Sequence, residues 1–370
     1  MRYNWDLKEL EANRIILEKI YKNIDNDTLK EKLSNVINMY VNMIRIAKKN
    51  IKGMQEFDRN YKDISVDIII NDLLTTYNKN TIMYWDVILN SYFPIRNYEF
   101  NGNNVFRKIK TNNQELVDIA IDFFNEMTTP TIANKFQNIL NDGNRIQINY
   151  EKGSSNYGGL TLFENLLKNK YIYIRRENEL LDLVLLPHEA FHYMFMGENN
   201  DIVGNYNTMY LNEVEGMFAN ILFTDYADKI TENGSKYFKD YFNNTYKLFV
   251  YDAVIRYAII QSITNKRKIK FNKLNQFLET ICPNPEHFEK EEQFIKYLDT
   301  PQDFTMTYTL SYLTAIDLYY KYLNDRDEAF YFLECIRNYK KTNQVFNLLN
   351  NNGITFMNDN YENLKRYIKK

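Results

Sequence analysis

The sequence predicts a mainly helical fold that carries one small β-sheet, and three observations lead to this prediction. Only 6 prolines and 11 glycines occur among 370 residues, so long stretches contain no strong helix breaker. The apolar residues of these stretches recur mostly at the three- and four-residue spacing of amphipathic helices. The segment 145–176 is the exception, because short β-prone runs and glycines interrupt the helical pattern there.

The predicted helices follow this spacing from the N-terminus onward. The first covers about residues 7–22 and the second about residues 28–53, where Gly53 is a plausible stop. Further helices are expected near residues 64–91, 114–127 and 130–141. Helical spacing resumes at about residue 208 and continues to the C-terminus, with turns near residues 233, 283 and 300.

Two strands and a loop are expected within the exceptional segment. Residues 146–150, Ile-Gln-Ile-Asn-Tyr, alternate as a strand does, and residues 171–174, Tyr-Ile-Tyr-Ile, are short and β-prone. Residues 153–159 between them are rich in glycine, serine and asparagine and indicate a loop. The resulting small sheet comes just before the most informative motif of the chain.

The length of the chain allows one large unit or two closely joined units. We divide it into an N-terminal helical segment, residues 1–80, and a larger compact unit, residues 81–370. No internal repeat and no low-complexity linker is recognisable. A core of this size can border a deep cleft.

Composition and charge exclude several classes of protein. A net charge of -2 provides no electrostatic basis for binding nucleic acid or an acidic membrane surface. No window approaches the roughly 20 uninterrupted apolar residues of a membrane helix. The 2 cysteines are too few for a disulfide framework or a cysteine zinc site. A soluble protein of the cytoplasm is therefore expected.

The run Pro187-His188-Glu189-Ala190-Phe191-His192 has the H-E-x-x-H pattern of zinc metallopeptidases. Positions four apart lie on one face of a helix, so His188 and His192 can both turn a ring nitrogen toward one metal ion. Glu189 then lies beside the ion without binding it. Its carboxylate can take a proton from metal-bound water and pass it to the leaving amine, as general base and then acid.

A catalytic zinc site needs a third protein ligand, and the run Leu211-Asn212-Glu213-Val214-Glu215-Gly216 offers one. Glu213 lies 21 positions after His192, which leaves room for a turn and a second helix packed against the first. Glu213 and Glu215 are about 200 degrees apart on a helix, so only one can face the ion. We favour Glu213; Glu215 is then a surface residue or one that supports the ligands from behind.

Pro187 leaves two local structures open. Residues 180–186 have the pattern of a helix already under way, and a proline at 187 removes one backbone hydrogen bond and tends to kink the helix. Either the helix bends just before the ligands or a new helix begins there. The spacing of His188 and His192 is compatible with both.

Three runs around the motif, residues 150–159, 171–174 and 179–189, follow the order of a glycine-containing loop, a short strand and the motif-bearing helix. In this order they resemble the oligopeptidase F and thimet oligopeptidase family of zinc metallopeptidases. Residues 212–216 look like the family's Ala-Glu-Val-Ala-Ser element, whose glutamate is the third ligand. Residues 304–315 are similar to its tyrosine-rich stretch.

The resemblance implies a two-lobed, mainly helical, zincin-like metallopeptidase with a deep cleft and a small β-sheet at the active-site edge. It implies that His188, His192 and Glu213 hold Zn²⁺ and that residues 81–370 form the catalytic domain. Tyr308 and Tyr312 fall on family tyrosines, of which one or more donate a hydrogen bond to the tetrahedral oxyanion. The chain is also shorter than typical members, so part of their N-terminal lobe is expected to be missing.

The expected function is hydrolysis of peptide bonds in oligopeptides rather than in folded proteins. Tyr171 and Tyr173 belong to the strand that we expect to pair with the substrate backbone. Gly158 and Gly159 would let that backbone approach closely. The partner is thus a peptide substrate, and the cofactor is Zn²⁺.

Two positions depart from the family pattern. The family often has a histidine shortly before the tyrosine-rich stretch, where this chain has Gln302, and a second glutamate seven residues after the ligand, where it has Asn220. These departures motivate an alternative, a catalytically weak, metal-containing peptide-binding or regulatory protein of the same fold. A helical structural protein with a fortuitous motif and an aminopeptidase of a related branch are further alternatives. His287, the remaining histidine, follows a proline-rich turn and has no assigned role.

Overall fold

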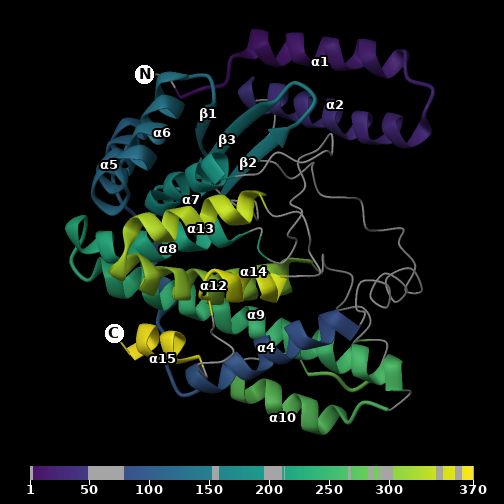
Figure 1. Cartoon of the computed structure of the whole chain (residues 1–370), viewed down its shortest axis with the longest axis vertical. Coiled ribbons are helices and arrows are strands. Elements are labelled where there is room, and N and C mark those ends of the chain that lie inside the picture. Colours follow the sequence, from purple (N-terminus) through teal and green to yellow (C-terminus); the bar gives the residue numbers. More distant parts are fainter. Residues whose placement is uncertain are drawn as a thin grey trace.

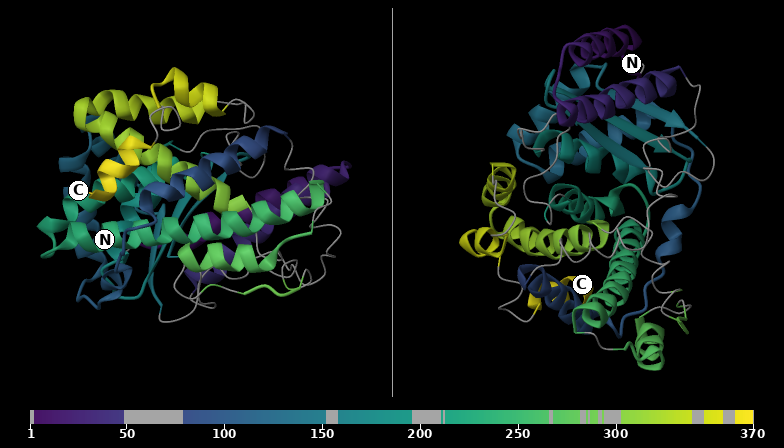
Figure 2. Two further views of the ribbon diagram at one scale, coloured as in Figure 1. Left: turned by 90° about the horizontal axis from the view of Figure 1, so that it is seen from below. Right: turned by 90° about the vertical axis from the view of Figure 1, so that its right-hand side faces the viewer.

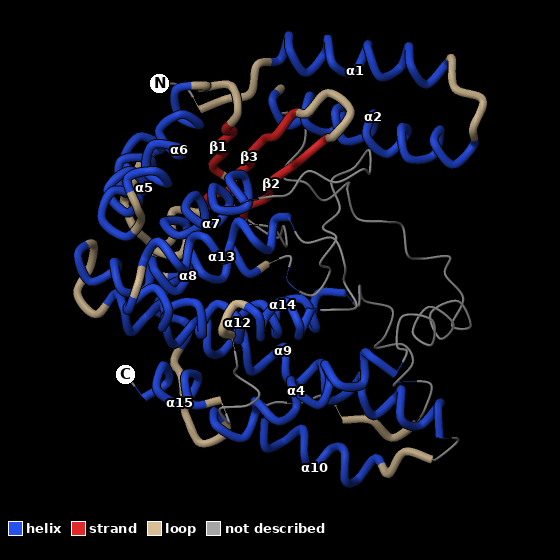
Figure 3. The backbone as a smooth tube through the Cα atoms, viewed as in Figure 1, coloured by secondary structure: helices blue, strands red, loops and turns tan. Residues whose placement is uncertain are grey.

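The computed structural model of this chain describes residues 3–48, 79–151, 158–195, 211, 213–265, 268–281, 285, 287–290, 293, 303–338, 345–354 and 361–369. Within these ranges the protein is mainly helical and contains a three-stranded sheet, which confirms the predicted fold class (Figures 1 and 3).

The helices follow the chain in this order: α1 (Leu7–Lys22), α2 (Asp27–Ala47), α4 (Lys79–Ile95), η3 (Gly102–Phe106), α5 (Asn113–Met127), α6 (Pro130–Asn141), α7 (Asp182–Phe195), α8 (Val214–Tyr226), η5 (Ala227–Lys229), α9 (Gly234–Asn265), α10 (Phe271–Ile281), α12 (Asp303–Asn324), α13 (Arg326–Asn338), α14 (Val345–Asn351) and α15 (Glu362–Lys369). The predictions at residues 7–22, 114–127 and 130–141 are confirmed. The described part of the second predicted helix is α2, and Gly53 lies outside the described residues.

Local capping explains why the helices begin where the sequence predicts. The Asp6 side chain accepts hydrogen bonds from two backbone N–H groups in the first turn of α1. Asn112 and Glu115 form a reciprocal capping box at the start of α5. Pro130 occupies the first turn of α6, where its missing N–H costs nothing.

The sheet contains β1 (Ile146–Tyr150), β2 (Gly159–Glu164) and β3 (Asn169–Arg176) in the order β1-β3-β2. β1 runs parallel and β2 antiparallel to the central strand β3. The two predicted strands are confirmed, whereas β2 was not predicted. Its signal is the short alternation Leu160-Thr161-Leu162. A turn follows in which Glu164 accepts hydrogen bonds from the backbone N–H groups of Leu166 and Leu167.

Helices cover both faces of this sheet (Figures 1 and 2). Tyr171 and Tyr173 of β3 pack with Trp5 and with buried residues of α1 and α2. Ile172 and Ile174, which point to the opposite face, belong to the larger core that includes α7. The sheet is therefore a layer between the α1–α2 pair and the helix that carries the H-E-x-x-H motif.

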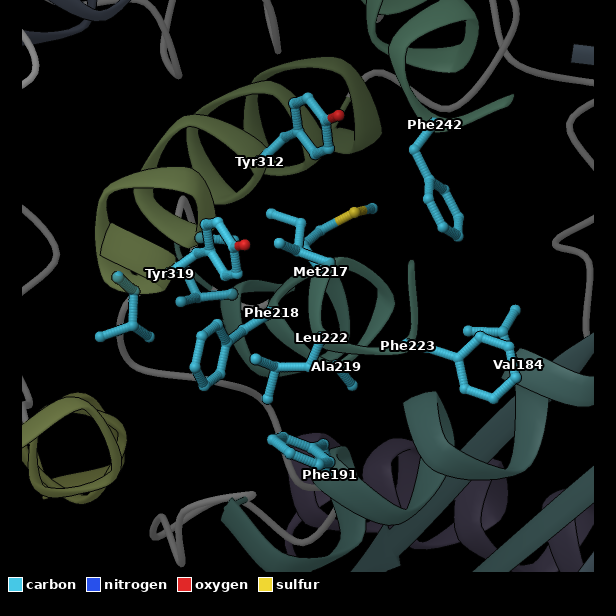
Figure 4. Packing of buried hydrophobic residues seen from close by; sticks show 14 of the residues in the cluster. Val184, Phe191, Met217, Phe218, Ala219, Leu222, Phe223, Phe242, Tyr312 and Tyr319 are labelled. Atoms are coloured by element: carbon cyan, nitrogen blue, oxygen red, sulfur yellow. The ribbon is translucent and has the colours of Figure 1, made fainter. Parts of the chain in front are cut away.

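The larger core is built around α7, α8 and α12. Apart from Asp225, the residues of α8 are all buried, as expected for a helix that is apolar on most of its circumference. Phe191 of α7, Phe218 of α8 and Phe330 of α13 form an aromatic cluster with ring centroids 5.9 to 6.3 Å apart. Figure 4 shows buried side chains of α7, α8 and α12, among them Phe191, Phe218 and Tyr319. This packing holds the start of α8 against α7.

α7 is one continuous helix from Asp182 to Phe195, with Pro187 inside it. A new helix therefore does not start at Pro187, and this removes one of the two local structures that the sequence left open. His188 and His192 follow the proline on the same helix.

The described helices include none with the length and apolar character needed to cross a bilayer. The predicted division into residues 1–80 and 81–370 stays a prediction; its boundary lies at the beginning of α4.

Candidate metal centre

Three side chains from two helical elements converge on one point. His188 and His192 come from α7, and Glu213 immediately precedes α8. The Nε2 atoms of the two imidazoles lie 3.1 Å apart. The Oε2 atom of Glu213 lies 3.2 Å from Nε2 of His192 and 3.7 Å from Nε2 of His188. These three side chains are the candidate ligands that the sequence predicts, and they lie together.

This arrangement fits a single divalent metal ion. Two ligand atoms that bind one tetrahedral zinc at about 2.0–2.1 Å lie roughly 3.3 Å apart, so the three observed distances are close to that value. Two histidines and one glutamate are also a ligand set of catalytic zinc sites, which keep a fourth position open. A search of the described residues for His, Cys, Asp and Glu side chains that lie close enough together to hold an ion finds this group of three.

The charges around the three ligands favour a cation. Burial opposes ionisation of Glu213, but the adjacent His192 and His188 lower the pKa of its carboxyl group to about 2. Burial also opposes protonation of His192, but the carboxylate of Glu213 raises the pKa of this imidazole to about 9. A metal ion therefore competes with a proton for a site whose carboxylate is ionised at neutral pH.

Asn220 of α8 orients the first histidine. Its Oδ1 atom lies 3.1 Å from Nδ1 of His188, which donates to it when the proton is on Nδ1. That tautomer leaves Nε2 without a proton and facing the other two ligands. Asn220 stands where the family that this sequence resembles has a glutamate, and its amide oxygen provides an acceptor at this place.

Hydrogen bonds to its backbone hold Glu213, the third candidate ligand, in place. The N–H of Glu213 donates to Oγ of Ser311 on α12 over 3.3 Å, and its carbonyl accepts from Met217 N over 2.9 Å within α8. The Glu213 carboxylate makes no capping bond to α8. It is thus available to the imidazoles instead of to the helix end.

Gly216 leaves the space in which the imidazoles lie. A Cβ atom at this position would lie 2.3 Å from Cε1 and 2.5 Å from Nε2 of His188, and 2.7 Å from Nε2 of His192. Glycine is unfavourable inside a helix, so a buried helical glycine signals a close approach of another group. Gly216 is therefore a signal of this close approach that can be read from the sequence.

Glu189 lies between α7 and the sheet. It is 5% exposed, and Oγ1 of Thr161 on β2 lies 2.7 Å from its Oε2 and 2.8 Å from its backbone oxygen. Burial raises the pKa of Glu189, although His188, His192 and the Thr161 hydroxyl oppose this rise. A buried carboxylate with a raised pKa can hold and release a proton.

Gly159 makes room for this carboxylate. A Cβ atom there would lie 2.7 Å from both Cγ and Oε1 of Glu189. The open space beside Gly159 is therefore filled by Glu189. A Cβ atom at Gly158 would lie 3.1 Å from the side chain of Leu185.

Glu215 lies behind the ligands and is fully buried, with 0% exposure. Its Oε2 atom is 4.0 Å from Nδ1 of His192. Burial raises the pKa of this carboxyl group to about 7. Of the two predicted roles for Glu215, a surface position is thus wrong.

A cavity of about 440 Å³ opens at the candidate metal centre on the His188 side, and its wall includes Gly158, Gly159, His188, Glu189, Asn220 and Tyr308. A second cavity of about 940 Å³ adjoins it, because Phe106, Tyr241 and Thr245 line both. The candidate metal centre therefore lies in a cleft that continues past α9.

The two candidate tyrosines occupy different places. Tyr308 lies on the cavity wall, with its ring 5.1 Å from that of Phe249. Tyr312 is 2% exposed, and its hydroxyl donates to Oδ1 of Asn243 over 2.8 Å. It lies among the packed side chains of the core, near Met217 and Phe242 (Figure 4). The structure brings Tyr308, and not Tyr312, to the cavity.

The role predicted for the strand 171–174 needs correction. β3 is hydrogen-bonded on both sides, so it has no edge free for a substrate strand. Tyr171 and Tyr173 are buried under α1 and α2, and their hydroxyls donate to Oε1 of Glu9 and of Glu151, over 3.2 and 2.8 Å. The period-two pattern predicted the strand but could not show which face is covered.

His287 lies apart from this centre. Its side chain is 54% exposed, and Nε2 is 3.5 Å from Oε1 of Glu279. No role in the candidate site follows from this position.

Solved structures share this fold over almost the whole chain. A structure described as an oligoendopeptidase F aligns with a TM-score of 0.57 and 15% identity over 93% of this chain and 65% of its own. A structure from Bacillus anthracis, also described as an oligoendopeptidase F, aligns with a TM-score of 0.54 and 14% identity. The alignment covers 93% of this chain and 63% of that structure's chain. The fold is that of the oligoendopeptidase F structures.

PZ peptidase A, solved with an inhibitor, is similar as well, with a TM-score of 0.55 and 12% identity over 92% of this chain and 68% of its own. The present chain spans less than two thirds of the length of the two oligoendopeptidase F structures. Comparisons with protein families and with curated proteins find no match.

Proposed function

We propose that this protein is a zinc-dependent metallopeptidase that hydrolyses peptide bonds in oligopeptides. The observation that carries the proposal is the convergence of His188, His192 and Glu213 near the buried carboxylate of Glu189. His188 and Glu189 also line a cavity. The fold shared with an oligoendopeptidase F and with PZ peptidase A supports the same activity.

In the proposed reaction His188, His192 and Glu213 hold the zinc ion. When bound, this ion supplies Lewis acidity at the reacting carbonyl. Glu189 accepts the proton of the attacking water and later donates it to the leaving amine. Thr161 keeps the Glu189 carboxylate in place through its hydroxyl, and the packing of β2 against α7 excludes bulk water from it.

The proposed substrate is an extended peptide. In the described sheet the two outer strands, β1 and β2, each have one side without a strand partner. Of these two, β2 carries Gly159 and Thr161, which lie next to Glu189. A peptide can add to such an edge through backbone hydrogen bonds. We therefore propose that the substrate contacts β2 instead of β3. The adjoining cavities provide space for side chains on the opposite wall.

Tyr308 is our candidate for the group that stabilises the oxyanion. Its position on the cavity wall lets a phenol hydroxyl face the same space as His188 and Glu189. A hydrogen bond that forms as negative charge develops lowers the barrier of this reaction class.

The function is tested by incubating the zinc-loaded protein with a mixed pool of oligopeptides and reading the products by mass spectrometry. We expect internal cleavage of peptides that a chelator abolishes and added zinc restores. Stoichiometric zinc without cleavage would instead support the metal-containing peptide-binding protein considered as the alternative.

Replacing Tyr308 by phenylalanine is expected to lower kcat by about 10²–10³-fold with little change in KM, because one hydrogen bond to the transition state is lost. Tyr312→Phe is the matched control: it loses the bond to Asn243 and about 1 kcal/mol of stability but keeps kcat. Steady-state kinetics on one cleaved peptide and thermal melts of both variants provide the comparison. Equal loss of kcat in the two variants would contradict the assignment.

A further inference from the structure

Two buried polar groups face each other behind the proposed metal ligands. Nδ1 of His192 is buried and forms no hydrogen bond, and neither carboxylate oxygen of Glu215 is hydrogen-bonded to another residue. The distance between Nδ1 and Oε2 of Glu215 is 4.0 Å. A movement of about 1 Å brings this pair to the 2.7–3.2 Å of an N–H···O hydrogen bond.

A buried carboxylate without a hydrogen-bond partner lowers the stability of the fold, so its presence calls for an explanation. An ionised group moved from water into a protein interior without a partner destabilises the fold by several kcal/mol or becomes protonated. Glu215 lies in the first turn of α8, where the peptide dipoles favour a negative charge, and its neighbours Val214 and Gly216 are buried as well. The imidazole of His192 is the nearby group that the negative charge of Glu215 can stabilise.

Resting on the function proposed above, we infer that Glu215 is a positioning residue for the metal site: it accepts the Nδ1–H of His192 and so fixes the tautomer in which Nε2 binds zinc. Asn220 performs the same task for His188 through its amide oxygen. The two imidazoles are thus supported by two different groups, both from α8. A carboxylate partner also makes the imidazole a stronger ligand than an amide does.

Glu215→Gln tests this assignment, because the amide has nearly the same shape but no negative charge. The Kd for Zn²⁺, measured by competition with a chromophoric chelator, is expected to rise about 10–100-fold. The melting temperature of the metal-free protein is expected to stay the same or to rise, because an unpaired buried carboxylate has been removed. The visible spectrum of the Co²⁺-substituted variant is expected to differ from that of the wild type.

Glu164→Gln is the matched control. Glu164 is equally buried, at 0% exposure, but its carboxylate accepts from the backbone N–H groups of Leu166 and Leu167. This variant is expected to lose stability and keep the wild-type Kd for Zn²⁺. The opposite pattern, with Glu215→Gln less stable and unchanged in Zn²⁺ affinity, would overturn the inference and leave Glu215 a packing residue.

A measurement on the wild-type protein covers the case in which Glu215→Gln does not fold. The chain has 3 histidines, so ¹⁵N-histidine labelling gives a simple imidazole spectrum. We expect His192 in the Zn²⁺-loaded protein to show a protonated Nδ1 and a metal-bound Nε2. Binding of the metal through Nδ1 would refute the inference. Wild-type protein that takes up no zinc would refute the proposed function itself, whereas tight zinc with an unaffected Glu215→Gln refutes this inference alone.

Discussion

Glu189→Gln is expected to lower kcat/KM for peptide cleavage by about 10²–10⁴-fold, the usual contribution of a general acid–base group. The glutamine has the same shape as the glutamate, so it still accepts a hydrogen bond from Thr161 and fits beside Gly159. It cannot take a proton from the attacking water. Steady-state kinetics on a peptide cleaved by the wild-type protein measures the loss.

Zinc content and melting temperature of the same samples separate chemistry from folding. The Glu189→Gln protein is expected to keep one zinc ion, since Glu189 is not a ligand in our account. Glu164→Gln makes the same change at a buried carboxylate at the end of β2 and is expected to keep kcat/KM near the wild-type value. Full activity of Glu189→Gln would remove the proposed mechanism.

Gly216→Ala is expected to abolish stoichiometric zinc binding, with a loss of affinity of at least about 10³-fold. Its Cβ atom would lie 2.3 Å from Cε1 of His188 and 2.7 Å from Nε2 of His192, inside the space of both rings. Neither ring can easily move away, because α7 and α8 are packed in the core. The effect exceeds the 10–100-fold cost of removing a group that only supports a ligand, since the ligands themselves are displaced.

Gly143→Ala is the matched control, because a Cβ atom there meets only Leu140 O, at an ordinary 3.8 Å. It is expected to keep zinc binding and peptide cleavage. Chelator competition and metal analysis after gel filtration measure both variants. Wild-type zinc affinity in Gly216→Ala would show that the ion binds elsewhere than between His188 and His192.

The parts of this structure that depend on local sequence could be predicted well. The capped helices α1, α5 and α6 follow from their periodicity and their first residues. His188 and His192 share a face because the spacing of a helix requires it. The position of Glu213 next to the two histidines could be inferred, because a catalytic zinc site has three protein ligands and this acid follows the motif in the sequence.

The parts that depend on contacts between distant elements could not be predicted from the sequence. Alternation identified β3 but not its central place in the sheet, so Tyr171 and Tyr173 were assigned to the substrate although α1 and α2 cover them. The roles of Gly216 and Thr161 arise only when α8 and β2 pack against α7. Tyr308 and Tyr312 are one helical turn apart, yet only tertiary packing decides which of them meets the cavity.

The central claim is that one divalent cation binds between His188, His192 and Glu213. Diffraction from zinc-soaked crystals, recorded on both sides of the zinc absorption edge, tests it most directly. We predict one anomalous peak per chain at about 2.0–2.2 Å from Nε2 of each imidazole and from the Glu213 carboxylate. No peak between these three groups, or a peak bound by other side chains, would contradict the account.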